Sequence, residues 1–353
     1  MVTQRAASVC CLLVLCAAAC KPELAGRPSL VESERVLALR SSPAEAAPDA
    51  RVTYDALFVG PDGAGSPDAL EWALCNQRKA LTESGTIARA CLQLESDALA
   101  ALEPQSEGVR ASVPRDACET FGPTPKTPKP GEPNLRPVDP DTTGGFYQPV
   151  RVAVVSEDEQ TRFAVGVTRL TCALGGATQE QSAEYNRKRR PNENPHLDAL
   201  VWLREDGSEE TLPQADDEPA LTVSLGERVQ LRASWPDCPV EPSCGDGICS
   251  VGELDCADDC REPRGCGGSE PYVYFDPLSR QLLDRREALR VAWFATDGAF
   301  EHERTGRSAD EADDTTTENV WRAPESDAEV RLWVVLRDDR GGVGWGSYRL
   351  QVQ

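Results

Sequence analysis

The stretch from Cys244 to Cys260 carries the densest chemical pattern in the sequence, C-G-D-G-I-C-S-V-G-E-L-D-C-A-D-D-C. Closely spaced thiols pair as disulfides when a chain is exported to an oxidising compartment. Asp246, Glu253 and Asp255 also offer the hard oxygen ligands that calcium prefers. Their order is not that of an EF-hand loop. Solvent-exposed acids on a disulfide framework are therefore the favoured interpretation, and a calcium site is the alternative.

This stretch resembles the short cysteine-rich repeats beginning C-G-D-G-x-C that are common in secreted proteins of myxobacteria. The resemblance implies a small module held together by disulfides, because so short a segment cannot bury a core of its own. We expect it as an insertion at residues 236–268, with Cys238 and Cys266 as its outer pair.

The N-terminus has the composition of a secretory signal peptide over residues 1–19. Arg5 supplies a positive charge, an apolar stretch follows, and Ala17 to Ala19 are the small residues that suit a signal peptidase. The apolar run is shorter than the roughly 20 residues that a membrane span requires. We therefore expect a cleaved leader and an exported chain.

Ala17-Ala18-Ala19-Cys20 resembles the lipobox of bacterial lipoproteins. The resemblance implies that Cys20 is lipidated and becomes the new N-terminus, with residues 20–34 as a tether. More than one acyl chain at that position anchors a protein stably, whereas one chain binds only marginally. Lys21 after the cysteine implies, by analogy with lipoprotein sorting, the outer membrane of the cell envelope.

The remaining cysteines agree with export. Three cysteines would leave with the leader and Cys20 would carry lipid, which leaves ten, an even number that indicates disulfides. Cys75–Cys91 and Cys118–Cys172 are the favoured pairs in the first half. The disulfide candidates are Cys75, Cys91, Cys118, Cys172, Cys238, Cys244, Cys249, Cys256, Cys260 and Cys266.

Composition excludes several classes of function. A formal net charge of −22 argues against nucleic-acid binding, which needs concentrated Lys and Arg. The sequence has two histidines, His196 and His302, and lacks the H-E-x-x-H, G-x-S-x-G and Walker motifs. We expect no enzymatic activity and no cofactor other than the alternative calcium. A hydrolase that uses two carboxylates stays open as a rival, because acidic pairs are abundant.

Strand patterns recur along most of the chain. Apolar residues alternate with polar ones in many short runs, and the clearest is the C-terminal hairpin around Asp338 to Gly342. Arg51 to Ala56 resembles Arg228 to Ala233, and a strand with a tryptophan follows each, Trp72 early and Trp293 late. These features predict a mainly β chain of two immunoglobulin-like β-sandwiches with a small disulfide-rich insertion.

The expected domains follow from these patterns. The first sandwich should span residues 35–175 and contain a Pro-rich loop at 123–149, and the second should span 197–353. Residues 176–196 should connect them, and the basic cluster at 187–190 should be a solvated helix face that docks on the acidic domains. Contact of that cluster with anionic lipid is the alternative.

Three further expectations concern less regular parts. Residues 86–102 have helical spacing, and residues 301–319 read as a solvated loop. Trp333 lies out of phase with its apolar neighbours, so it should share the opposite face of its sheet with Trp345. Packing against a neighbouring loop is favoured there over an exposed aromatic platform.

The mature chain as a whole resembles immunoglobulin-like lipoproteins of myxobacteria. The segments that carry the resemblance are V-L-A-L-R at 36–40, G-G-F-Y-Q-P-V-R at 144–151 and L-R-D-D-R-G-G at 336–342. The resemblance implies location and architecture, not activity. We therefore expect a membrane-anchored, non-enzymatic structural or binding module for protein or glycan, with a calcium-dependent adhesion module and a carboxylate-based hydrolase as alternatives.

Overall fold

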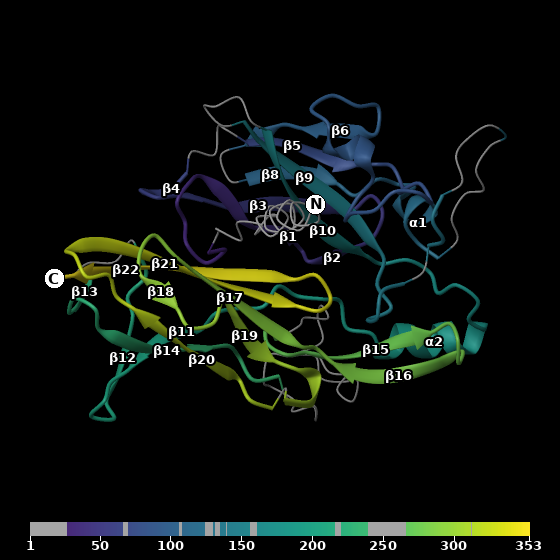
Figure 1. Ribbon diagram of the computed structural model, residues 1–353. Helices are drawn as coiled ribbons and strands as arrows, with labels where there is room; N and C mark the ends of the chain where they lie inside the picture. Colours follow the sequence, from purple (N-terminus) through teal and green to yellow (C-terminus); the bar gives the residue numbers. More distant parts are fainter. Residues whose placement is uncertain are drawn as a thin grey trace, which may run out of the picture.

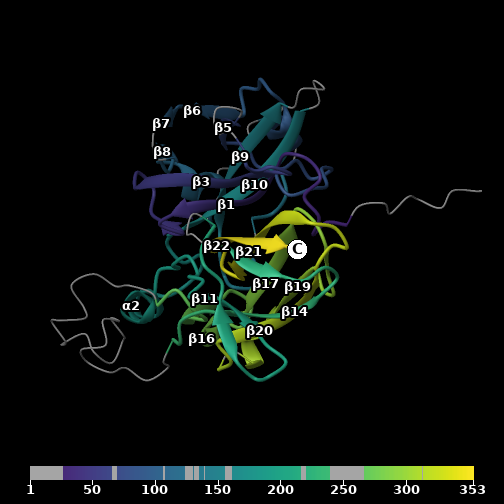
Figure 2. The same ribbon diagram turned by 90° about the vertical axis from the view of Figure 1, so that its left-hand side faces the viewer.

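The computed structural model describes residues 27–65, 70–105, 108–123, 130, 135–138, 140–155, 161–215, 220–238, 266–311 and 313–353. These residues form two β-sandwiches, one stacked on the other (Figure 1). The view turned by 90° shows the same stacking, with the hairpin of β21 and β22 facing the first sandwich (Figure 2). The predicted mainly β fold is confirmed.

Two five-stranded sheets make the first sandwich. One contains β1 (Arg35–Ser42), β3 (Arg51–Gly60), β8 (Gly108–Ser112) and β7 (Pro104–Gln105) in that order, with β4 (Gly63–Ala64) paired to β3. The other has the order β2 (Glu45–Ala46), β10 (Thr161–Leu170), β9 (Tyr147–Val155), β5 (Leu70–Cys75) and β6 (Leu99–Leu102).

The second sandwich repeats this plan. Its first sheet has the order β12 (Glu209–Thr211), β11 (Ala199–Leu203), β14 (Arg228–Ser234), β20 (Thr316–Arg322) and β18 (Ala299–Phe300). Its second sheet has the order β13 (Leu221–Val223), β22 (Val343–Val352), β21 (Ala328–Asp338), β17 (Leu289–Ala295) and β19 (Arg304–Arg307).

Strand order identifies both sandwiches as immunoglobulin-like. In each sandwich the first two long strands are neighbours in one sheet, β1 beside β3 and β11 beside β14, and a later strand, β8 or β20, lies on the other side of the second of them. The last strand of each sandwich, β10 or β22, belongs to the other sheet. A short strand runs parallel to that last strand, β2 beside β10 and β13 beside β22. The third core strand of each, β5 or β17, carries a buried tryptophan, Trp72 or Trp293, as the fold requires. The short echo in the sequence thus marked equivalent strands.

Alternation explains the cores. In β21 the side chains of Val330, Leu332, Val334 and Leu336 are fully buried in the core of the second sandwich. Because successive side chains of a strand point to opposite faces, the residues between them face away from that core. The tryptophan of each third strand belongs to the core cluster of its own sandwich, Trp72 in the first and Trp293 in the second.

Three disulfides hold irregular segments against the sheets. Cys75–Cys91 and Cys118–Cys172 are bonded in the first sandwich, in agreement with the expected pairs. Cys238–Cys266 closes the base of the insertion, with 5.7 Å between the two Cα atoms. The other four cysteines of the insertion, and Asp246, Glu253 and Asp255, lie outside the described residues, as does Cys20.

The insertion continues beyond its disulfide as a hairpin. β15 (Pro271–Asp276) and β16 (Gln281–Arg286) pair with each other between β14 and β17. Helix α2 (Gln179–Lys188) of the connector packs beside this hairpin (Figure 1). It begins with a capping box at Thr178, whose hydroxyl accepts from the Gln181 N–H while the Gln181 side chain accepts from the Thr178 N–H.

Two local predictions were wrong. Residues 86–102 hold a short 3₁₀ helix, Arg89–Leu92, and then strand β6 in place of one helix. The helical spacing of the sequence is overridden by two tertiary constraints. The Cys75–Cys91 bond holds the first part of this segment, and pairing with β5 makes residues Leu99–Leu102 a strand. A single-turn helix, α1 (Ala117–Thr120), follows later in this sandwich.

Residues 301–319 are not a solvated loop. They contain β19, a 3₁₀ turn at Ala309–Glu311 and the first half of β20. The sequence pattern did not predict β20, because two of its buried positions hold polar residues, Thr317 and Asn319. Their side chains are hydrogen-bonded inside the protein. Asn319 donates to the His302 carbonyl at 2.7 Å, and the Thr317 hydroxyl accepts from the Gly306 N–H at 3.2 Å.

Candidate functional site

The two sandwiches meet through an apolar interface. Val31, Leu37, Ala38, Leu57 and Val59 of the N-terminal segment and first sandwich pack against Ala292, Trp333, Val335 and Val343 of the second. These side chains lie on outer sheet faces, which an isolated sandwich would expose to water. Their mutual burial favours the association of the two domains.

This interface resolves the expectation for the out-of-phase tryptophans. Trp333 and Trp345 do share the outer face of their sheet, as expected. They cover the first sandwich and not a loop, and the Arg40 guanidinium lies 4.1 Å from the centroid of the Trp345 ring. The expected tether also ends earlier than residue 34, because Val31 is fully buried and its N–H donates to the Ala295 carbonyl at 2.8 Å.

At one end of the interface, Arg340 in the β21–β22 turn is sealed from solvent. Its side chain is 2% exposed, and its Nη1 donates to Glu287 Oε1 at 3.0 Å and lies 3.5 Å from Glu270 Oε2. Its Nη2 donates to the Arg190 carbonyl at 2.8 Å and to Glu45 Oε2 at 3.4 Å. One guanidinium therefore joins the first sandwich, the connector and the base of the insertion.

The carboxylates around Arg340 outnumber the guanidiniums that contact them closely. Asp338 adds a fourth buried carboxyl group and accepts from the N–H groups of Arg340 and Gly342, each at 2.8 Å. Burial would lower the pKa of Arg340, but the four carboxylates outweigh burial and raise it. Arg340 is therefore permanently charged, and the question is which carboxyl groups keep a proton.

The two carboxyl groups at the base of the insertion retain protons most readily. Burial raises the pKa of Glu270 from 4.5 to about 7, although Arg340 opposes the shift. Burial and then the charge of Glu270 raise the pKa of Glu287 well above its ordinary value. Burial also raises the pKa of Asp338. The buried cluster of carboxyl groups around Arg340 is therefore more stable when at least one of these carboxyl groups is protonated.

The pKa of Glu45 shifts in the opposite direction, because Glu45 lies in the first sandwich beside further guanidinium groups. Burial disfavours its charge, but the guanidiniums of Arg169, Arg340 and Arg189 outweigh burial and lower its pKa. Arg169 Nε lies 3.5 Å, and Arg189 Nη2 4.0 Å, from its carboxylate oxygens. The basic cluster of the connector therefore docks on an acidic group, as expected, and its Arg190 is buried and not solvated.

A hydrogen-bonded chain leads from Glu45 to the surface of the first sandwich. Arg169 donates to the Tyr147 hydroxyl at 3.0 Å, and that hydroxyl donates to Asp141 Oδ2 at 2.5 Å. Burial, with Asp141 nearby, raises the pKa of Tyr147, which therefore stays a neutral donor. The other oxygen of Asp141 accepts from the N–H groups of Thr143 and Gly145, both at 2.9 Å.

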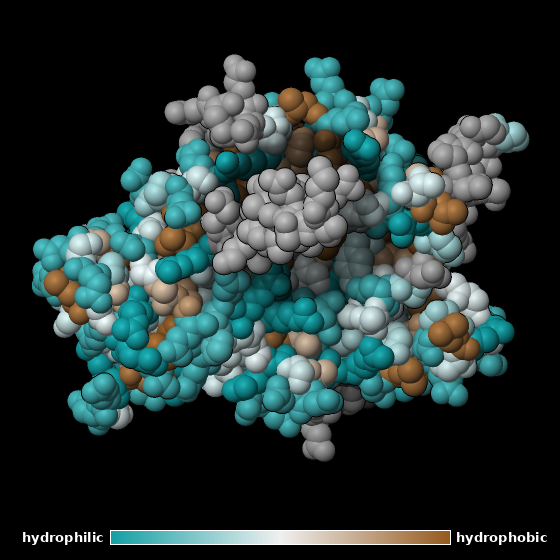
Figure 3. Space-filling model, viewed as in Figure 1, coloured by the Kyte–Doolittle hydropathy of each residue, from teal (hydrophilic) through white to brown (hydrophobic). Residues whose placement is uncertain are grey.

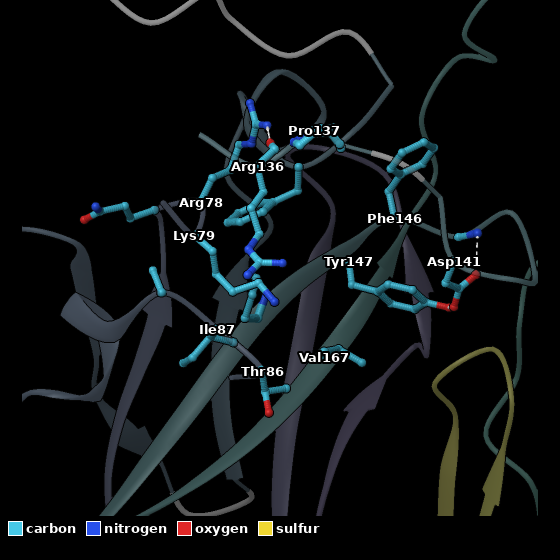
Figure 4. Close-up of a pocket in the computed structure, with 16 residues that line it drawn as sticks. Arg78, Lys79, Thr86, Ile87, Arg136, Pro137, Asp141, Phe146, Tyr147 and Val167 are labelled. Atoms are coloured by element: carbon cyan, nitrogen blue, oxygen red, sulfur yellow. Dashed lines mark hydrogen bonds between the residues drawn. The ribbon is translucent and has the colours of Figure 1, made fainter. Parts of the chain in front are cut away.

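Tyr147 and Asp141 form one wall of an open pocket with a volume of about 400 Å³. Figure 4 shows Arg78, Lys79 and Arg136 gathered across the pocket from Phe146 and Tyr147, with Thr86, Ile87 and Val167 along its floor. The pocket has the size of a small-molecule site and combines apolar lining with a few convergent polar groups.

Positive charge collects in this pocket although the chain is acidic. Arg78 donates to the Arg136 carbonyl, Arg136 donates to the Glu83 carbonyl, and Lys79 donates to the Gly85 carbonyl at 2.8 Å. Among the residues that the structure describes, no carboxylate forms an ion pair with these three side chains. The described residues therefore fix the positions of these cations through neutral carbonyl groups.

Two constraints hold the pocket open. The Cys75–Cys91 disulfide fixes the segment that carries Arg78 and Lys79 to the edge of β5. An antiparallel bridge between Ala80 and Leu135 then brings Arg136 to the same place from the Pro-rich region. Arg136 follows the adjacent pair Arg78 and Lys79 by more than fifty residues, and no spacing rule would have brought it to them.

The face of the molecule in Figure 3 is mainly hydrophilic, with small, separate hydrophobic spots. Within the described ranges, no three His, Cys, Asp or Glu side chains are placed to hold a metal ion, and no helix has the length and apolar character to cross a membrane. The candidate calcium ligands lie outside those ranges, so calcium binding stays a prediction.

Comparisons with known proteins give only remote likenesses. No family model and no curated protein matches the sequence. The C-terminal domain of the antigen I/II polypeptide BspA of Streptococcus agalactiae is 10% identical, with a TM-score of 0.23 over 90% of this chain and 99% of that one.

The C-terminal domain of the antigen I/II-family protein AspA of Streptococcus pyogenes gives 10% identity and a TM-score of 0.22, over 92% of this chain and 99% of that one. E. coli alpha-2-macroglobulin gives 11% and 0.19, over 91% of this chain and 16% of its own. The immunoglobulin-like assignment therefore rests on the strand order of the two sandwiches themselves.

Replacing Arg340 with methionine should destabilise the protein strongly. The change keeps an unbranched, flexible side chain but leaves buried carboxylates without their cation, and breaking a buried pair in this way costs about 3–5 kcal/mol. Arg322→Met, at an exposed position at the end of β20, is the matched control. Urea unfolding followed by tryptophan fluorescence measures the free energy of unfolding of each, and equal losses for both variants would contradict the role given to Arg340.

Stability should fall as the pH rises from about 4.5 through neutrality. Glu270 and Glu287 bind protons more tightly in the folded than in the unfolded protein, so their contribution is complete below pH 4.5. The part due to Glu270 is lost by about pH 7, and the part due to Glu287 is lost as the pH rises through its own raised pKa. The slope is about 1.4 kcal/mol per pH unit for each proton released. Glu45, with a lowered pKa, adds a loss on the acid side.

Glu287→Gln should flatten the alkaline decline, because the amide cannot ionise. Glu329→Gln, an exposed position on β21, should leave the pH profile as it is. Thermal unfolding from pH 4 to pH 9 measures both. A wild-type protein whose stability rises from neutral to alkaline pH would show that the sign is wrong.

Proposed function

We propose that the chain is a non-enzymatic binding module of the cell envelope, anchored by lipid at Cys20, that holds a glycan or protein ligand in the basic pocket of its first sandwich. The observation that carries the proposal is the pocket of about 400 Å³, which is lined by three cations and three aromatic residues. The disulfide Cys75–Cys91 and the interface between the sandwiches support it, because a binding site needs a rigid frame.

The anchor follows from the resemblance of the leader to a lipobox. Only six residues separate Cys20 from Arg27, and seven extended peptide steps span at most about 25 Å. Residues 29–31 are fixed to β17 at the junction of the two sandwiches. A lipid on Cys20 would therefore hold the junction close to the membrane surface, with the outer membrane as the proposed location.

The geometry gives less support to the two rival functions. Among the described residues, Glu45, Glu270, Glu287 and Asp338 form a cluster of carboxyl groups, and all four are buried at the junction, where a substrate has no access. Calcium-dependent adhesion would rest on the cysteine-rich insertion. A thermal unfolding midpoint that rises on addition of calcium and falls with chelator would favour that rival.

Cys20→Ser should release the protein from membranes. The serine cannot accept the lipid, and no described helix spans a bilayer, so the variant should partition into the aqueous phase of a detergent phase separation. The wild-type protein should partition into the detergent phase and take up labelled fatty acid. An unprocessed wild-type protein inside the cell, with free thiols, would contradict the proposal.

Thr86→Trp should block ligand binding by filling the pocket. Thr86 is exposed at the pocket floor, so the indole needs no rearrangement of the core and changes no charge. Thr211→Trp, an exposed position on β12 of the second sandwich, is the matched control. Both proteins are compared with wild type for binding to purified envelope polysaccharide and envelope protein fractions by biolayer interferometry.

The expected result is a loss of about tenfold or more for Thr86→Trp and none for Thr211→Trp, since a filled pocket excludes the ligand outright. Equal binding by the two variants would place the ligand elsewhere and would remove the pocket from the proposal.

A further inference from the structure

The cations of the pocket have capacity for an additional anionic partner. The hydrogen bonds that fix Arg78, Lys79 and Arg136 end on neutral carbonyl oxygens. Lys79 has three donor hydrogens and each arginine has five, so most of their donors are not used by these bonds. The charge of the three side chains is likewise not balanced by any ion pair within the described part of the chain.

The opposite wall offers acceptors and apolar surface. Asp141 is exposed, and its carboxylate is held in one orientation by Tyr147, Thr143 and Gly145. Gln77 and Thr86, also exposed, line the same pocket with an amide and a hydroxyl. Phe146 adds a half-buried ring. A ligand that fits this wall carries hydroxyl groups on a body with an apolar face.

From these two walls we infer that the ligand is an acidic sugar residue, whose carboxylate lies against Lys79, Arg78 and Arg136 and whose hydroxyls donate to Asp141. The inference rests on the proposed function of the pocket and names its ligand class. Charge-assisted hydrogen bonds from arginine or lysine to a carboxylate are the strongest polar contacts the pocket can make.

Charge also argues against an extended acidic peptide. Asp141 stands within the pocket, and the chain carries a formal net charge of −22, so a run of carboxylates would be repelled outside the three cations. A ligand with a single carboxylate on a neutral, hydroxylated ring avoids this repulsion. Its carboxylate contacts the cations, and one of its hydroxyl groups donates a hydrogen bond to Asp141.

The test uses two probes that differ only at one carbon, methyl glucuronide with a carboxylate and methyl glucoside with a hydroxymethyl group. A peptide of three glutamates is the third probe. Binding to the full mature chain is followed by chemical-shift titration in 50 mM and 300 mM NaCl. Lys79→Ala removes one pocket charge, and Arg51→Ala, at an exposed position on β3, removes one charge elsewhere on the same sandwich.

We expect wild type to bind methyl glucuronide about tenfold or more tightly than methyl glucoside, and Lys79→Ala to lose a similar factor, as a charge-assisted hydrogen bond predicts. Binding should weaken at the higher salt concentration. Arg51→Ala should bind as wild type does, and circular dichroism should show that both variants are folded.

Three results would overturn the inference. They are equal binding of the two sugars, undiminished binding by Lys79→Ala, and tighter binding of the glutamate peptide. If any of these occurs while Thr86→Trp still abolishes binding of envelope fractions, the pocket remains a binding site and only the ligand class is wrong. If Thr86→Trp changes nothing either, the proposed function fails with it.

Discussion

The guanidinium of Arg340 is the contact on which the arrangement of the whole molecule depends. Its carboxylate partners come from positions 45, 270 and 287, which belong to the first sandwich and to the two ends of the inserted hairpin. A buried charge is tolerated only when it is paired and hydrogen-bonded, and removal of one partner leaves the others strongly unfavourable. The group therefore forms only when both sandwiches, the connector and the insertion are in place together. The apolar contacts of Trp333 and Val335 favour association in general, while the charged group restricts it to one orientation.

That orientation links the junction to the pocket. Glu45 accepts from Arg340 on one side and pairs with Arg169 on the other, and Arg169 holds the hydroxyl of Tyr147 at the pocket wall. Each member of the chain is kept in its charge state by its neighbours: Glu45 ionised by the guanidiniums, and Tyr147 neutral by burial. The wall of the pocket is thus part of the same polar network that fixes the domains, which explains why a surface site in a Pro-rich region has a defined geometry.

The sequence predicted the features that local patterns encode and missed those that depend on distant partners. Alternation located the strands, and Trp72 and Trp293 identified the third core strand of each sandwich. The turn Asp338 to Gly342 was read as a hairpin, correctly, but nothing local shows that Arg340 is buried, because the same residue types are typical of exposed turns. The one local indication of a buried charge is that Arg340 stands alone among acidic residues and glycines. The sequence gives no local indication of the pocket, because its cations are brought together by the bridge between Ala80 and Leu135.

In the binding site that we propose, an acidic chain with a small cationic pocket would discriminate between anions in a way that a basic surface would not. Beyond about 8–10 Å, the Debye length at ordinary ionic strength, solvent screens individual charges, so a ligand within the pocket responds chiefly to Lys79, Arg78 and Arg136. A long polyanion would extend past the pocket onto a surface with an excess of Asp and Glu, where each further negative charge is unfavourable. Repulsion thereby selects against the ligands that a basic surface would bind most tightly. In the proposed site, the negative charge of the chain would contribute to specificity, because it would favour a ligand with isolated charges on a neutral body.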